Sequence, residues 1–150
     1  MDRIGMKLQI SSRLAVFAIL ELAADPDRRV SVADIGKKCG VSSHHLAKVM
    51  HVLARAGLVR SLRGAGGGYR FVGNARRTTL LDVFELFETI GVNSRHEVGD
   101  RTDEGRALRQ VLGEIDGIAR ATLGSITIAT MLNLVRRRRD DRRAAESVHR

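Results

Sequence analysis

The residues of this sequence best suited to chemistry are the arginines and glycines between Gly57 and Val72, GLVRSLRGAGGGYRFV. Arg60, Arg63 and Arg70 flank a run that contains four glycines. Glycine has no Cβ, so it relaxes the steric limits on φ and lets the backbone approach a ligand closely. Such a loop can lie against a polyanion at backbone distance, with guanidinium groups binding its charge.

Two known phosphate-binding loops fit this stretch less well. The dinucleotide pattern G-x-G-x-x-G needs a glycine where Tyr69 stands, and a helix must follow, whereas a β-like run follows here. The Walker A pattern needs a closing Lys-Ser/Thr pair, which this loop lacks. We therefore predict a β-hairpin, with arms at Leu58 to Leu62 and Tyr69 to Val72 and a basic, glycine-rich tip.

Cys39 and the histidines at positions 44, 45 and 51 are the one nearby set that could serve nucleophilic catalysis or metal binding. His44 and His45 diverge on a helix, and a turn separates them from Cys39, so we expect neither an enzyme nor a metal site. Lys37 and Lys38 favour a reactive thiolate at Cys39, but a helix C-terminus opposes it. A buried structural thiol is the first interpretation of Cys39, and redox sensing is the alternative.

The elements that precede the hairpin have helical patterns. Ser11 or Ser12 can cap a first helix that runs to about Ala24. Ser31, followed by Asp34, is expected to cap a second helix over residues 32–38. Ser42 is expected to cap a third helix through Ala56, which Gly57 ends.

Gly40 provides a short turn between the second and third helices, which is the helix-turn-helix arrangement. The second helix of such a pair enters the major groove of DNA with its N-terminal residues. The candidate reading face therefore consists of Ser43, His44, His45, Ala47 and Lys48.

The charge of the chain is unevenly distributed. The net charge is +9, and residues 1–76 carry 13 Lys/Arg against 5 Asp/Glu, whereas residues 77–150 carry 13 against 12. A basic segment that also has the helix caps and short turn of a helix-turn-helix favours double-stranded DNA as the partner. A membrane surface is less favoured, because no basic amphipathic helix with aromatic anchors is present.

Composition limits the remaining possibilities. With 150 residues, 43% of them hydrophobic, the chain can bury one good core. A single cysteine argues against a disulfide framework and for a reducing compartment. No apolar run approaches the roughly 18 residues of a membrane span. We expect a soluble, cytoplasmic protein.

The second half of the chain is expected to be helical. Thr79 and Asp82 cap a fourth helix that continues to Ile90, and Thr102 caps a long helix from Asp103 to about Leu123. The long helix carries an apolar stripe that a second copy of the chain would cover. We assign dimerisation to Leu108, Val111, Leu112, Ile115, Ile118 and Leu123. A short helix follows to Val135, and residues 137–150 are expected to form a charged, disordered tail.

Several of these residues resemble the Rrf2 family of bacterial winged-helix transcription regulators. The resemblance is carried by Ala56-Gly57-Leu58-Val59 and by the wing motif that starts Arg63-Gly64 and ends Gly67-Gly68-Tyr69. It implies a homodimer that binds an operator with imperfect two-fold symmetry. It also implies that Arg63 enters the minor groove from a tip containing Gly64, Gly66 and Gly67. The operator sequence does not follow from the resemblance. We expect a repressor, although the sequence does not distinguish a repressor from an activator.

The best-known members of that family hold an iron-sulfur cluster on cysteines in the loop before the long helix. The matching loop here, Gly91 to Arg106, contains no cysteine and offers only His96. We therefore expect no cluster and no other cofactor. The loop could be a relic, a linker or a site for an unknown small effector.

These observations predict a mainly α fold with a small β-hairpin wing. The expected divisions are a winged helix-turn-helix domain at residues 1–76, a helical dimerisation or effector region at residues 77–136, and the tail.

Overall fold

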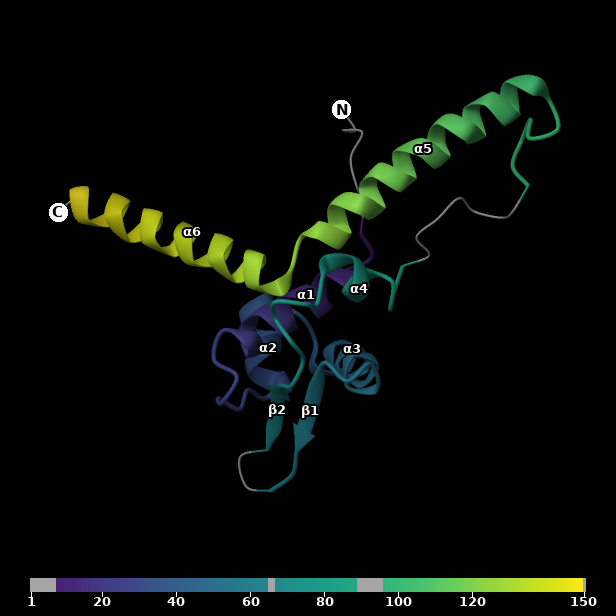
Figure 1. Ribbon diagram of the computed structural model, residues 1–150. Helices are drawn as coiled ribbons and strands as arrows, with labels where there is room; N and C mark the ends of the chain where they lie inside the picture. Colours follow the sequence, from purple (N-terminus) through teal and green to yellow (C-terminus); the bar gives the residue numbers. More distant parts are fainter. Residues whose placement is uncertain (1–7, 65–66, 89–95, 150) are drawn as a thin grey trace.

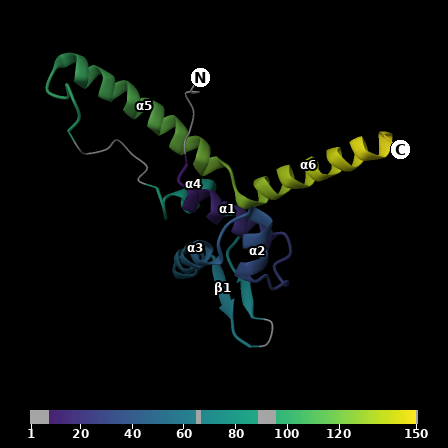
Figure 2. The same cartoon turned by 180° about the vertical axis from the view of Figure 1, so that it is seen from behind.

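The computed structural model describes residues 8–64, 67–88 and 96–149. Helices α1 (Ile10–Ala23), α2 (Val32–Cys39), α3 (Ser43–Arg55) and α4 (Leu80–Phe84) form a head together with strands β1 (Val59–Leu62) and β2 (Gly68–Phe71). Helices α5 (Asp103–Ser125) and α6 (Ile128–Val148) project from this head in different directions (Figures 1 and 2). The predicted fold class is confirmed. No described helix combines the length and the apolar character that crossing a bilayer would require.

Side-chain caps begin most of the helices as predicted. Ser31 Oγ accepts a hydrogen bond from the Asp34 amide at 3.1 Å, and Ser42 Oγ accepts one from the His45 amide at 3.3 Å. The same pairing opens α4, where Thr79 and Asp82 form a reciprocal capping box, and α5, where Thr102 is the cap. These residues satisfy amide groups that have no partner within the first turn of a helix.

The prediction that Ser11 or Ser12 caps α1 is wrong, because Gln9 stands at the N-cap. Ser12 is fully buried and donates to Glu88 Oε1 at 2.9 Å. The Gln9 amide donates to the same oxygen at 2.6 Å. Both groups therefore tie the start of α1 to a residue far along the chain.

A tight turn joins α2 to α3. Gly40 caps α2 with a left-handed φ of 70°, a conformation that favours glycine. The Val41 amide donates to the Gly36 carbonyl at 2.9 Å, and a Cβ on Gly36 would lie only 2.9 Å from the Val41 oxygen. The backbone of α2 therefore touches the turn that leads into α3.

The hairpin is attached to the segment before α2. Its strands pair antiparallel from Val59 opposite Phe71 to Leu62 opposite Gly68, within one residue of the predicted arms. Tyr69 and Val30 exchange two backbone hydrogen bonds, of 3.2 and 2.9 Å. This bridge holds the wing against the start of the helix-turn-helix.

One hydrophobic core connects the two halves of the chain. Its fully buried members include Ile19 and Leu22 of α1, Leu46 of α3, Val83 of α4 and Ile128 of α6. The backbone also joins the halves, since the Leu80 amide donates to the Ile126 carbonyl and the Ile128 amide donates to the Thr78 carbonyl, both at 2.9 Å. The predicted division after residue 76 stays a prediction, and the core extends across it.

Two helix lengths differ from expectation. α4 ends at Phe84 and is followed by turns, while the end expected at Ile90 lies outside the described residues. The prediction of a disordered tail is wrong, because α6 continues to Val148. Arginine, alanine and glutamate are good helix formers, and Arg142 and Glu146 lie 4.0 Å apart at i,i+4 spacing.

Candidate nucleic-acid interface

α3 and the hairpin lie on the same side of the head. Both views show α3 next to β1 and the hairpin pointing away from α5 and α6 (Figures 1 and 2). Of the predicted reading residues, the structure exposes Ser43, His44, Ala47 and Lys48 on α3. A duplex laid against this side could therefore meet the recognition helix and the wing together.

His45 occupies a different position from the other predicted reading residues. It is half-buried, and its Nε2 lies 3.3 Å from Ser11 Oγ on α1. Leu46 and Val49, one and four residues later on the same helix, are buried in the core. His45 thus connects α3 to α1, and helical spacing alone did not predict this contact.

Glycine shapes the tip of the wing. Arg63 and Gly64 are exposed, and Gly64 has a φ of 112°, in the region that favours glycine. The Gly67 amide donates to the Gly64 carbonyl at 2.9 Å, and a Cβ on Gly67 would lie 2.8 Å from the Leu62 oxygen. Gly66, also assigned to the tip, lies outside the described residues. The turn therefore places Arg63 at the end of β1 with little side-chain bulk behind it.

The charged side chains of α3 and of the hairpin have one sign. No acidic residue stands between Asp34 and Asp82 in the sequence, whereas nine lysines and arginines do. The interval contains all of α3 and both strands. Counting charges over halves of the chain missed this acid-free interval, although the sequence displays it. A surface of one sign attracts a polyanion and repels none of its phosphates.

The predicted dimerisation residues divide into two groups. Leu108, Val111, Leu112, Ile115 and Ile118 are 51–69% exposed along α5. Leu123 differs, because it is only 9% exposed and belongs to the core of its own chain. Leu123 lies where α5 leaves the head, so the head covers it. The other five lie on one face of α5 by their spacing and are exposed in the single chain.

Cys39 is half-buried at the end of α2. Burial raises the pKa of its thiol above the usual value; the charge of Lys38 lowers that pKa and the charge of Glu21 raises it. The reactive form of cysteine is the thiolate, so this environment opposes reactivity at neutral pH.

The donor set does not fit an iron-sulfur cluster. Cys39 is the single thiol of the chain, and clusters are held by several thiolates. His96, the one imidazole of the loop before α5, lies 4.0 Å from Asp100 Oδ2. Within the ranges that the structure describes, no three His, Cys, Asp or Glu side chains are grouped to hold a metal ion.

Comparison with known proteins identifies the family of the chain. The Rrf2 family, described as an iron-dependent transcriptional regulator, matches residues 8–134. The provisionally named HTH-type transcriptional regulator BadM of Rhodopseudomonas palustris is 49% identical over 130 residues, covering 87% of this chain and 83% of BadM. The HTH-type transcriptional regulator IscR of Vibrio vulnificus is 33% identical over 132 residues, covering 85% of this chain and 78% of IscR.

Solved structures agree with these sequence relatives. CymR, the global cysteine regulator of B. subtilis, superposes with a TM-score of 0.73 at 25% identity, covering 87% of this chain and 98% of CymR. IscR of T. potens gives a TM-score of 0.70 at 28% identity, covering 88% and 90%. These proteins are regulators rather than enzymes. The chain belongs to the Rrf2 family of helix-turn-helix transcription regulators.

Proposed function

We propose that this chain is a homodimeric, sequence-specific DNA-binding repressor that acts in the cytoplasm of a bacterial cell. The observation that carries the proposal is the single basic side formed by the N-terminal half of α3 and the Arg63 tip of the wing. α3 offers short polar side chains and Lys48 to the major groove, where base edges can be distinguished. Arg63 is suited to the minor groove, which is narrow and strongly negative over A·T-rich tracts.

The apolar face of α5 supports the homodimer. It stands clear of the head and has no cover within the described chain (Figure 1). A second copy of α5 has the same apolar face, so a two-fold pairing covers both faces at once. Two α3 helices related in this way would read half-sites about 34–36 Å apart. A dimer spread over both half-sites would exclude other proteins from the operator, which is the physical basis for repression.

We further propose that DNA binding needs no iron-sulfur cluster. One thiol in the chain cannot hold a cluster of the usual kind, so the apo-protein should bind DNA and should be indifferent to iron chelators. The first alternative is that the protein senses oxidants through the Cys39 thiol, but burial raises the pKa of that thiol and so disfavours the reactive thiolate. A small effector is the other alternative.

Selection of bound duplexes from a random pool by the purified protein tests the function directly. We expect a motif with imperfect two-fold symmetry, bound with a strong dependence on salt concentration. Arg63→Ala should then weaken binding to that motif by about 1–3 kcal/mol. Arg143→Ala removes the same charge from the far part of α6 and should leave affinity nearly unchanged.

Failure to enrich any symmetric motif would refute sequence-specific binding by a dimer. Equal affinities of the Arg63→Ala protein and the unaltered protein, with both folded, would refute the role of the wing. Visible charge-transfer absorption with stoichiometric iron and sulfide in anaerobically purified protein would refute the cluster-free proposal.

A further inference from the structure

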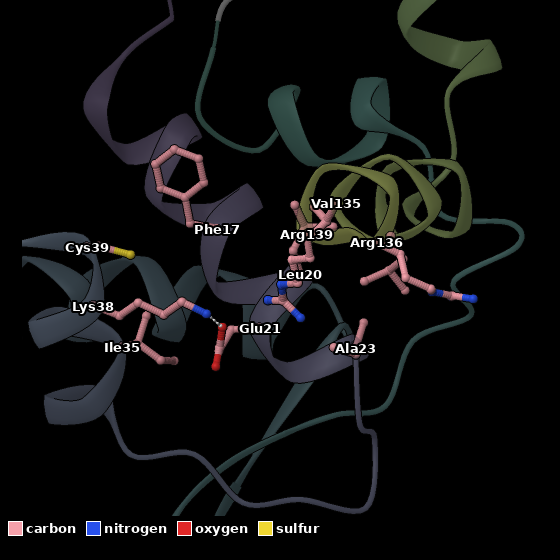
Figure 3. Close-up of a pocket in the computed structure, with 12 residues that line it drawn as sticks. Phe17, Leu20, Glu21, Ala23, Ile35, Lys38, Cys39, Val135, Arg136 and Arg139 are labelled. Atoms are coloured by element: carbon pink, nitrogen blue, oxygen red, sulfur yellow. Dashed lines mark hydrogen bonds and ion pairs between the residues drawn. The ribbon is translucent and has the colours of Figure 1, made fainter. Parts of the chain in front are cut away.

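A pocket of about 690 Å³ lies between α1, α2 and α6, away from α3 and the wing (Figure 3). Its apolar walls include Phe17 and Leu20 of α1, Ile35 of α2, and Leu132 and Val135 of α6. A pocket of this size and composition is typical of small-molecule sites, which commonly measure about 300–1,000 Å³. We call it the α1–α2–α6 pocket.

α6 brings both apolar and cationic side chains to this pocket. Leu132, Val135, Arg136 and Arg139 all line it, and their i, i+3, i+4, i+7 spacing places them on one face of the helix. Arg136 and Arg139 have no ion-pair partner within the described ranges. In Figure 3 the guanidinium of Arg139 lies among the lining residues near the Glu21–Lys38 pair, whereas that of Arg136 extends to the side.

The pocket carries an excess of positive charge. Its lining holds three cations, Lys38, Arg136 and Arg139, and a single carboxylate, Glu21. Glu21 is already paired with Lys38, and Arg28 Nη1 lies 3.9 Å from its other oxygen. The two arginines therefore remain available for an anion, and a guanidinium binds a carboxylate through two parallel hydrogen bonds.

We propose that the α1–α2–α6 pocket binds a small organic acid, with a carboxylate held by Arg139 and an aliphatic or aromatic body packed on the apolar walls. A fully polar anion would leave those walls in contact with water, and a neutral apolar molecule would form no ion pair with Arg139. The site goes beyond the proposed DNA-binding function and does not rest on it. The occupant would contact α2, the first helix of the helix-turn-helix, and α6 at the same time.

Cys39 provides the measurement, because it lines the pocket and is the single thiol of the chain. Iodoacetamide adds one mass increment at this residue, and an occupant of the pocket should shield it. The rate of alkylation of the full-length protein is measured with octanoate, with 2-naphthoate and with neutral 1-octanol. Each rate is divided by the rate of the same variant without additive, which removes any effect of the variant on the thiol itself.

We expect at least one of the two acids to slow alkylation several-fold and octanol to slow it much less. Arg139→Gln should raise the half-protecting concentration about tenfold or more. Arg137→Gln is the matched control, since it removes the same charge from a position on α6 that does not line the pocket. Its protection should equal that of the unaltered protein.

Three results would overturn the proposal. The first is that neither acid slows alkylation of the unaltered protein. The second is that the Arg139→Gln variant is protected as well as the unaltered protein. The third is that octanol protects as well as octanoate, which would show an apolar crevice without anion recognition. None of these measurements involves DNA, so they are independent of the test of the proposed function.

Discussion

Replacing Ile115 by alanine should weaken the proposed dimer by about 2 kcal/mol. Ile115 is 57% exposed in the single chain, and full burial of an isoleucine side chain is worth about 1.5–3 kcal/mol. Covering the exposed part in a dimer therefore contributes about 1–1.5 kcal/mol to the free energy of association. The two-fold dimer contains two copies of Ile115, so the total is about twice that value. Alanine retains one methyl group of that contact, which leaves an expected loss of about 2 kcal/mol, or about 30-fold in the dimer dissociation constant.

Sedimentation velocity over a dilution series measures this constant. Alanine has the highest helix propensity, so the substitution should not disrupt α5. Glu114→Ala is the control, because it alters an exposed polar neighbour and should leave the constant within about twofold. An Ile115→Ala protein that dimerises as tightly as the Glu114→Ala protein would show that this face of α5 is not the dimer contact.

Three further changes test the packing of the head. Gly68→Ala should destabilise the fold by about 1–3 kcal/mol in urea denaturation, because its Cβ would lie 2.7 Å from the Val30 carbonyl oxygen. Ser12→Ala should cost about 1.5–3 kcal/mol in the same assay, since a buried hydroxyl that donates to the Glu88 carboxylate is lost. The alkylation rate of Cys39 should rise with pH around a midpoint above that of the urea-unfolded protein, because burial raises the thiol pKa and only the thiolate reacts.

Each of these has its own control. Gly117→Ala adds a Cβ that meets nothing within 4 Å, so it should be neutral or stabilise by up to about 1 kcal/mol. Ser147→Ala alters an exposed serine and should change stability by less than about 0.5 kcal/mol. Lys38→Gln should move the Cys39 midpoint to still higher pH, since the charge of Lys38 lowers that pKa. A destabilisation as large for Gly117→Ala as for Gly68→Ala, or a Cys39 midpoint below that of the unfolded chain, would contradict the reasoning.

Local chemistry made most of the fold predictable. Each predicted cap accepts a hydrogen bond from an amide only three residues later, so the signal and its effect are close together in the sequence. These caps are Ser31, Ser42, Thr79 and Thr102. The wing was predictable for the same reason, because a run of glycines between two short β-like segments has few alternatives.

Long-range contacts account for what was missed. Ser12 resembles a cap by type and position, yet its hydroxyl bonds Glu88, 76 residues away. The contact of His45 with Ser11, 34 residues earlier, was not predicted, and the assignment of His45 to the reading face stays a prediction. The spacing of Leu132, Val135, Arg136 and Arg139 was visible in the sequence, but the pocket exists only because α1 and α2 lie opposite that face. The Arg-rich run was expected to be disordered because its composition does not show that α6 continues through it to Val148.

The joint between the two halves of the chain limits how proteins of this build can be rearranged. Thr79 and Thr127 form a backbone bridge, and the Ala129 amide donates to the Ala75 carbonyl at 2.8 Å. Ile128 is fully buried in the same core as the helix-turn-helix. A DNA-reading cassette cut after residue 76 would expose that core, so a chimeric regulator should take both sides of the joint, residues 75–80 and 126–129, from the same parent.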